Sequence, residues 1–139
     1  MERLVEFMNE RNNYLDRYFK LNAREIELFA ENNFDSIDAF YETRSAILEV
    51  IHALDERIDI EIKQTEVAAI QALENQVAEI LTYKDEVIEK ILDQDLEILS
   101  LIETEKNSVM QELMSSKKNK KAVGAYKSGK RKVSFQQEA

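Results

Sequence analysis

The chain has 139 residues, no cysteine, no proline and only two glycines, and 34% of its residues are charged. Both glycines lie beyond residue 123, so the first 123 residues lack the residue types that most often end helices or form tight turns. This composition predicts a single all-α domain. The absence of cysteine excludes disulfides, thiolate nucleophiles and most structural zinc sites.

The net charge of −9 is divided unevenly along the chain. Residues 1–115 contain 11 Lys and Arg against 27 Asp and Glu, a net charge of −16, whereas residues 116–139 contain 8 against 1, a net charge of +7. We therefore expect an acidic helical bundle over 1–115 and a basic, flexible tail over 116–139. No run of 18 apolar residues and no signal-sequence pattern occurs, so a cytoplasmic location is expected.

The first predicted helix covers about residues 2–31, because apolar residues recur there at three- and four-residue steps. Residues 32–36 then favour a turn, since Asn, Asp and Ser side chains compete for main-chain hydrogen bonds. Asp35 is the expected N-cap of the second helix, and Asp38 would place a negative charge in its first turn.

The second predicted helix runs from Ile37 to about Ile62, with apolar residues mostly at seven-residue spacing. Beyond residue 66 the apolar pattern resumes about two positions out of phase. The shift indicates a break at 62–66, with Thr65 as a candidate N-cap for the next helix. A single long helix through this region is the alternative, because neither Gly nor Pro marks the turn.

The third predicted helix covers 66–115 and extends at most to Val123, with Gly124 as its C-cap residue. A capping-box pattern at Thr82 is the alternative start of a fourth helix, although the apolar pattern keeps its phase there. The expected fold is therefore an elongated antiparallel bundle of three long helices, or four if the chain breaks at Thr82, followed by the basic tail.

If it is continuous, the third helix is about 75 Å long, whereas the second is about 42 Å long. Its second half is therefore expected to expose an apolar stripe that another chain must cover. The covering chain is either an amphipathic helix of a partner protein or a second copy of this chain, as a homodimer. The candidate partner-binding residues are Val87, Ile91, Ile98, Leu101, Ile102 and Val109.

Enzyme activity is not expected from this sequence. The only histidine, His52, and carboxylate pairs such as Asp93 and Asp95 are better explained as solvated helix faces, because acid–base catalysis needs a desolvated cleft. No Gly-rich phosphate loop, Ser/His/Asp set or His/Cys metal spacing is present. We expect neither cofactor nor metal.

The basic residues of 117–132 favour an acidic protein partner or a solvated tail over nucleic acid or a membrane. The acidic bundle would repel a polyanion, and only Tyr126 and Phe135 offer aromatic rings for stacking on bases.

Three segments have features in common with one protein family. Residues 31–55 combine a short polar turn with a helix in which Arg44 precedes an Ile-Leu pair. Residues 91–103 place an Asp-x-Glu step before an apolar run, and residues 117–126 form a basic segment leading to a tyrosine. In this order they resemble the FlgN/FliT group of flagellar type III export chaperones.

The resemblance implies a cytoplasmic helical chaperone that holds a helical segment of a late flagellar protein, such as a hook-associated or filament-cap protein, and delivers it to the export gate. It implies client contact for the late stripe and export-gate docking for Tyr126. The residues beyond Tyr126, including Lys130–Lys132 and Phe135, have no counterpart in the family. A coiled-coil adaptor or scaffold, with the basic tail contacting an acidic partner, nucleic acid or membrane, is the alternative.

Overall fold

The computed structural model describes residues 2–127, and the side chains of residues 3–118. Its elements are α1 (Glu2–Ala30), α2 (Ile37–Gln64), α3 (Val67–Ala72) and α4 (Glu74–Lys127). No strand occurs in this part of the chain, which confirms the all-α fold. The chain divides into two units, Met1–Leu101 and Ile102–Ala139.

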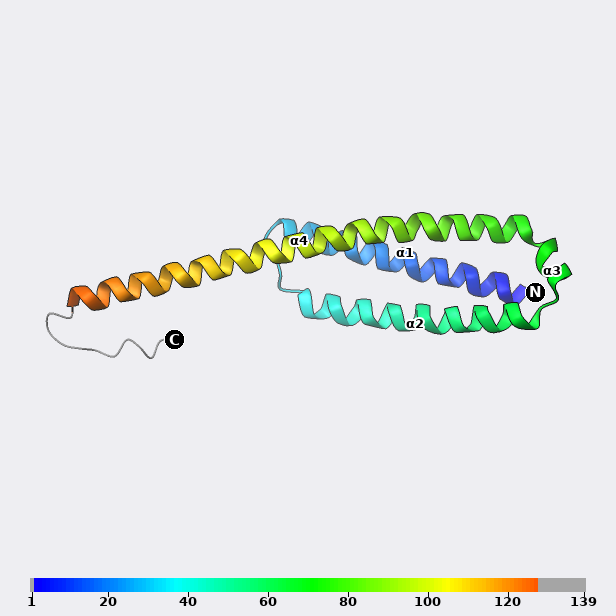
Figure 1. The fold of residues 1–139 in the computed structure, drawn as a ribbon, viewed down its shortest axis with the longest axis horizontal. Helices are drawn as coiled ribbons and strands as arrows, with labels where there is room; N and C mark the ends of the chain where they lie inside the picture. Colours follow the sequence, from blue (N-terminus) through cyan, green and yellow to red (C-terminus); the bar gives the residue numbers. More distant parts are fainter. Residues whose placement is uncertain (1, 128–139) are drawn as a thin grey trace. The chain divides into compact units, whose positions relative to one another are not determined.

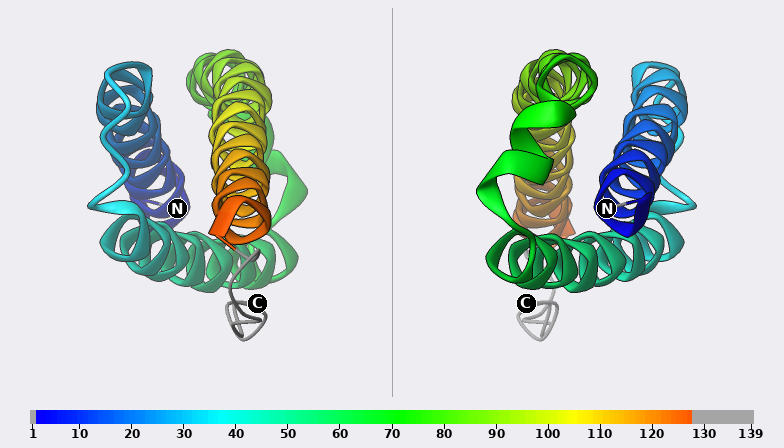
Figure 2. Two further views of the ribbon diagram at one scale, coloured as in Figure 1. Left: turned by 90° about the vertical axis from the view of Figure 1, so that its left-hand side faces the viewer. Right: turned by 90° about the vertical axis from the view of Figure 1, so that its right-hand side faces the viewer.

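The first unit is a bundle of α1, α2 and the part of α4 up to Leu101 (Figure 1). The chain reverses direction between α1 and α2 and again between α2 and α4, so α1 and α4 run parallel to each other and antiparallel to α2. Viewed along the helices, the three axes lie at the corners of a triangle (Figure 2). Each long helix therefore faces the two others with one apolar side.

The turn after α1 has the hydrogen bonds of a Schellman motif. Asn33 N–H donates to the Leu28 carbonyl at 2.9 Å, and Asn32 N–H donates to the Phe29 carbonyl at 3.0 Å. Asn32 has a positive φ of 63°, a conformation that asparagine tolerates better than most residues. Phe34 stacks on Phe29 with 4.6 Å between ring centroids, which closes the turn over the end of the helix.

The N-cap of α2 is Ser36, one residue after the predicted Asp35. The Ser36 hydroxyl does not cap the helix; it donates to the carboxylate of Glu25 on α1, at 2.9 and 3.1 Å from the two oxygens. Asp38 does lie in the first turn of α2, as predicted. The start of α2 is thus fixed to α1 by a side-chain contact that local sequence rules do not include.

The predicted break after α2 is confirmed, but its details differ. Thr65 ends α2 as its C-cap instead of starting the next helix, and its hydroxyl donates to the Glu61 carbonyl at 2.6 Å. Thr65 and Glu66 have extended main-chain angles, and the six-residue α3 follows. After α3 the chain turns again at Leu73, and α4 begins at Glu74. The sequence did not predict the separate short α3.

The helix α4 is continuous across Thr82, so the fourth helix that could begin there does not form. It also continues through Gly124, which is therefore not a C-cap, and the described part of the chain ends with the helix at Lys127. Residues 128–139 of the predicted tail lie outside the described residues. The flexibility predicted for residues 116–139 stays a prediction.

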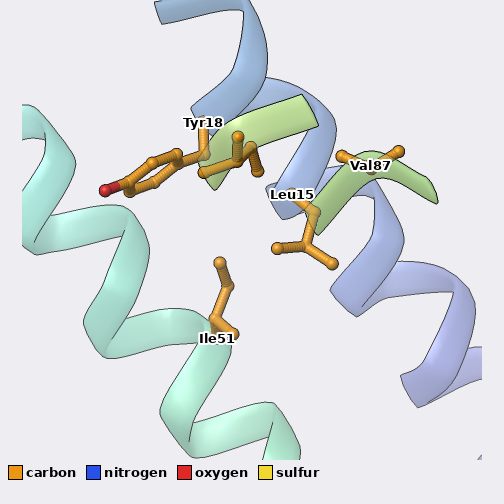
Figure 3. Close-up of a cluster of buried hydrophobic side chains, with 5 residues drawn as sticks. Leu15, Tyr18, Ile51 and Val87 are labelled. Carbon is orange, nitrogen blue, oxygen red and sulfur yellow. The ribbon is translucent and has the colours of Figure 1, made fainter. Parts of the chain in front are cut away.

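Two clusters of buried side chains form the core of the first unit. One contains Leu15, Tyr18, Ile51, Val87 and Ile91, and Figure 3 shows this cluster between the three helices. The other lies toward the start of α1 and consists of Leu4, Met8, Ile58 and Ile80. Both clusters take residues from α1, α2 and α4, so all three helices need one another to bury their apolar sides.

Candidate partner-binding surface

Three of the residues predicted to bind a partner belong to the core. Val87 and Ile91 pack beside Tyr18 and Ile51, and Ile98 is only 3% exposed. The 28 residues of α2 can cover a stretch of α4 of similar length, from Glu74 to Leu101. This cover corrects the expectation that the stripe is free from Val87 onward: these three residues stabilise the bundle.

The other predicted residues are more accessible. Leu101 and Ile102 are half-buried, and Val109 is exposed. Tyr126 lies within the bounds of α4, but its side chain is outside the described part of the structure. The predicted set is therefore not a single exposed stripe.

A different set of leucines forms an apolar surface on α4. Leu92, Leu96 and Leu99 are 59%, 68% and 63% exposed. They lie at positions i, i+4 and i+7, so they share one side of the helix. We call these three residues the leucine face. The predicted set contains none of these three leucines, although Leu92 and Leu99 have the same seven-residue spacing as the buried Ile91 and Ile98, one position later.

A row of carboxylates runs beside the leucine face. Glu89, Asp93 and Glu97 follow one another at four-residue spacing on α4, and all three are exposed. None of them forms an ion pair within the described residues. The leucine face is therefore flanked by three carboxylates that take part in no ion pair among the described residues.

The second unit has its own exposed apolar side chains. In its described part, residues 102–127, Val109, Met110, Leu113 and Met114 are all exposed. Their spacing places them on one side of the helix. This group includes Val109 of the predicted set and extends it by three residues.

A buried polar cluster in the first unit connects α1, α2 and α4. Asn22, which has no exposed surface, donates from Nδ2 to Gln94 Oε1 and Asp95 Oδ1, at 3.2 Å in both cases. Its Oδ1 accepts from Arg44 Nη1 at 3.4 Å, and the same guanidinium reaches Asp95 Oδ1 at 3.4 Å. Gln94 Nε2 in turn donates to the Phe19 carbonyl at 3.0 Å.

The guanidinium of Arg44 is also surrounded by aromatic rings. It lies 5.0 Å from the ring centroid of Phe40 and 5.3 Å from that of Tyr18. Such rings attract a cation through their negative faces. Burial raises the pKa of the Tyr18 hydroxyl, and the nearby Arg44 charge opposes that rise. The resemblance drew attention to Arg44 as a motif residue; the structure gives it a packing role.

The histidine and the carboxylate pair named from the sequence lie apart in their surroundings. His52 is exposed, Asp93 is exposed, and Asp95 is engaged with Asn22 and Arg44. Over residues 2–127 no three His, Cys, Asp or Glu side chains gather closely enough to hold a metal ion. In the same range, every helix is too short or too polar to cross a bilayer.

Comparison with known proteins adds no relative to this picture. No protein-family model, no curated protein and no solved structure matches the chain.

Proposed function

We propose that this protein is a non-catalytic binding protein that takes up an amphipathic helix of a partner on the leucine face of α4. The observation that carries the proposal is the exposure of Leu92, Leu96 and Leu99 on one side of a helix whose other side is already packed. Anchors at i, i+4 and i+7 are the usual pattern by which one helix holds another. Burying three such side chains contributes roughly 1–2 kcal/mol each, enough for a specific but reversible contact.

The charge beside the leucine face narrows the class of partner. Glu89, Asp93 and Glu97 would face the edge of any helix that lies along the three leucines. A partner helix with Lys or Arg beside its apolar side would neutralise them, whereas an acidic helix would be repelled. The proposed ligand is therefore an amphipathic helix with basic residues along one edge.

The resemblance to the FlgN/FliT group supplies the specific form of the proposal. In this form the protein is a cytoplasmic export chaperone, the ligand is a helical segment of a hook-associated or filament-cap protein, and Tyr126 contacts an export-gate component. The exposed leucine face, with unpaired carboxylates beside it, supports a binding role.

The proposal can be tested by titrating the helical C-terminal segments of the hook-associated and cap proteins of the same organism into the full chain. We expect Leu96→Asp to weaken binding at least tenfold, since a buried charge at one hot spot removes about 1.4 kcal/mol or more. Leu48→Asp, at an exposed leucine of α2, is the matched control and should bind normally.

Two results would contradict the proposal. Equal weakening by Leu96→Asp and Leu48→Asp would mean that the leucine face is not the binding surface. Sedimentation of the free protein as a tight oligomer, disrupted by Leu96→Asp, would instead indicate the adaptor or scaffold alternative, with the leucine face covered by other copies of the chain.

A further inference from the structure

The described part of the second unit, residues 102–127, is a single stretch of α4. Every side chain from Lys106 to Lys118 is exposed. A helix of this length without packing is only marginally stable in water, because most helices in proteins owe their stability to a buried apolar side. The segment therefore gains stability when another helix covers it.

The apolar side of this segment consists of Val109, Met110, Leu113 and Met114. Their exposed fractions are 44%, 52%, 60% and 61%, so none of the four is covered. They lie at positions i, i+1, i+4 and i+5, which places them on one side of the helix. We call these four residues the second-unit stripe. An exposed apolar patch of this kind marks a surface where another molecule binds.

The charge of the segment changes sign at the second-unit stripe. Residues 102–115 contain three Glu and one Lys, a net charge of −2, whereas residues 116–127 contain five Lys and no Asp or Glu, a net charge of +5. Glu103, Glu105 and Lys117 take part in no ion pair among the described residues. A helix with one acidic and one basic half complements its own antiparallel copy and repels its parallel copy.

We infer that residues 102–127 of two copies of this chain pair antiparallel, so that each second-unit stripe covers the other. A two-fold axis midway along the stripe sets Met110 level with Leu113 of the second copy, and Val109 level with its Met114. The same arrangement lays the acidic half of each helix along the basic half of the other. The inference goes beyond the proposed function, because the leucine face takes no part in the pairing.

Sedimentation equilibrium of the full chain tests the pairing. We expect a reversible dimer with a dissociation constant on the order of 10–100 micromolar, because four apolar side chains per copy make a small interface. Leu113→Asp should raise this constant at least tenfold and leave the helical circular dichroism signal intact. Leu96→Asp is the matched control, since it changes an equally exposed leucine of the leucine face, and it should leave the constant unchanged.

Disulfide formation tests the direction of the pairing. The chain has no cysteine of its own, so any cross-link reports the introduced positions alone. A Met110→Cys chain is mixed with a Leu113→Cys chain at a concentration where the dimer forms. Antiparallel pairing should cross-link unlike chains faster than like chains, whereas parallel pairing would favour like chains.

Four results would overturn the inference. They are a chain that stays monomeric well above the expected dissociation constant, a dimer weakened equally by Leu96→Asp and Leu113→Asp, and faster cross-linking between like chains. The fourth is a monomeric chain that binds phosphatidylserine vesicles and loses this binding in Leu113→Asp, which would assign the second-unit stripe to an anionic membrane. None of these results depends on binding of a partner helix to the leucine face, so the proposed function stands or falls separately.

Discussion

Asn22 on α1 donates a hydrogen bond to Asp95 on α4, with Nδ2 3.2 Å from Oδ1. Arg44 Nη1, on α2, lies 3.4 Å from Asp95 Oδ1 and also 3.4 Å from Asn22 Oδ1. One amide therefore joins all three long helices of the first unit. Because Asn22 is completely buried, no water can take the place of its partners.

The first prediction concerns this amide. Asn22→Ala removes the donor for Gln94 and Asp95 and the acceptor for Arg44, and we expect it to lower the free energy of unfolding by about 2–3 kcal/mol. Asn107→Ala, at an exposed position of α4, is the control and should change it by less than about 0.5 kcal/mol. Urea denaturation followed by circular dichroism measures both. A loss at Asn22 no larger than at Asn107 would mean that the cluster does not stabilise the bundle.

A second prediction separates core from surface on one helix. Ile98 and Leu96 are two residues apart on α4, yet Ile98 is 3% exposed and Leu96 is 68% exposed. Ile98→Asp should lower the free energy of unfolding by about 3 kcal/mol or more, because it buries an unpaired charge. Leu96→Asp should change it by less than about 0.5 kcal/mol. Thermal melts of the two variants would contradict the structure if their midpoints fell equally.

The turn after α1 gives a third prediction. Asn32 has a φ of 63°, which glycine adopts without strain and a β-branched residue adopts only at a cost of roughly 1–2 kcal/mol. We therefore expect Asn32→Gly to preserve or slightly raise the stability and Asn32→Val to lower it by about that amount. Chemical denaturation of the pair decides the matter, and a valine variant as stable as the glycine variant would rule out the left-handed conformation.

The fourth prediction is a dependence on alkaline pH. Burial raises the pKa of Tyr18 above its ordinary value of 10.0. Well below pH 10 the Tyr18 hydroxyl is protonated in both the folded and the unfolded chain, so its contribution to the free energy of unfolding is fully present there. As the pH rises above 10 the unfolded chain loses this proton first, and stability is lost up to the folded pKa. Stability measured from pH 9 to 11 should fall less steeply in Tyr18→Phe, and an unchanged slope would contradict this assignment.

The sequence predicted much of the fold because the helix ends carry local signals. The Asn-Asn-Phe-Asp-Ser segment stops α1 near the predicted residue, and the phase shift after Ile62 marks the end of α2. The errors arise where a distant residue decides the outcome. Ser36 is the N-cap because Glu25 holds its hydroxyl, and no rule limited to neighbouring residues includes that contact.

The candidate site was harder to predict for a physical reason. On α4 the pairs Ile91 with Ile98 and Leu92 with Leu99 both have seven-residue spacing, so periodicity alone gives two overlapping apolar sides. Only packing decides between them. The bundle buries the side that carries Ile91 and Ile98, next to Asp95 and its contact with Asn22, and leaves the leucines exposed.

Two side-chain amides also fix how far α4 is advanced along α1. Asn12 of α1 donates to the Ile80 carbonyl of α4, and Gln94 of α4 donates to the Phe19 carbonyl of α1. A lengthwise slip by one helical turn, about 5.4 Å, would move both donors past their carbonyls at once. The two helices therefore have a single lengthwise alignment, and a change that breaks it should open the bundle instead of shifting it to a neighbouring alignment.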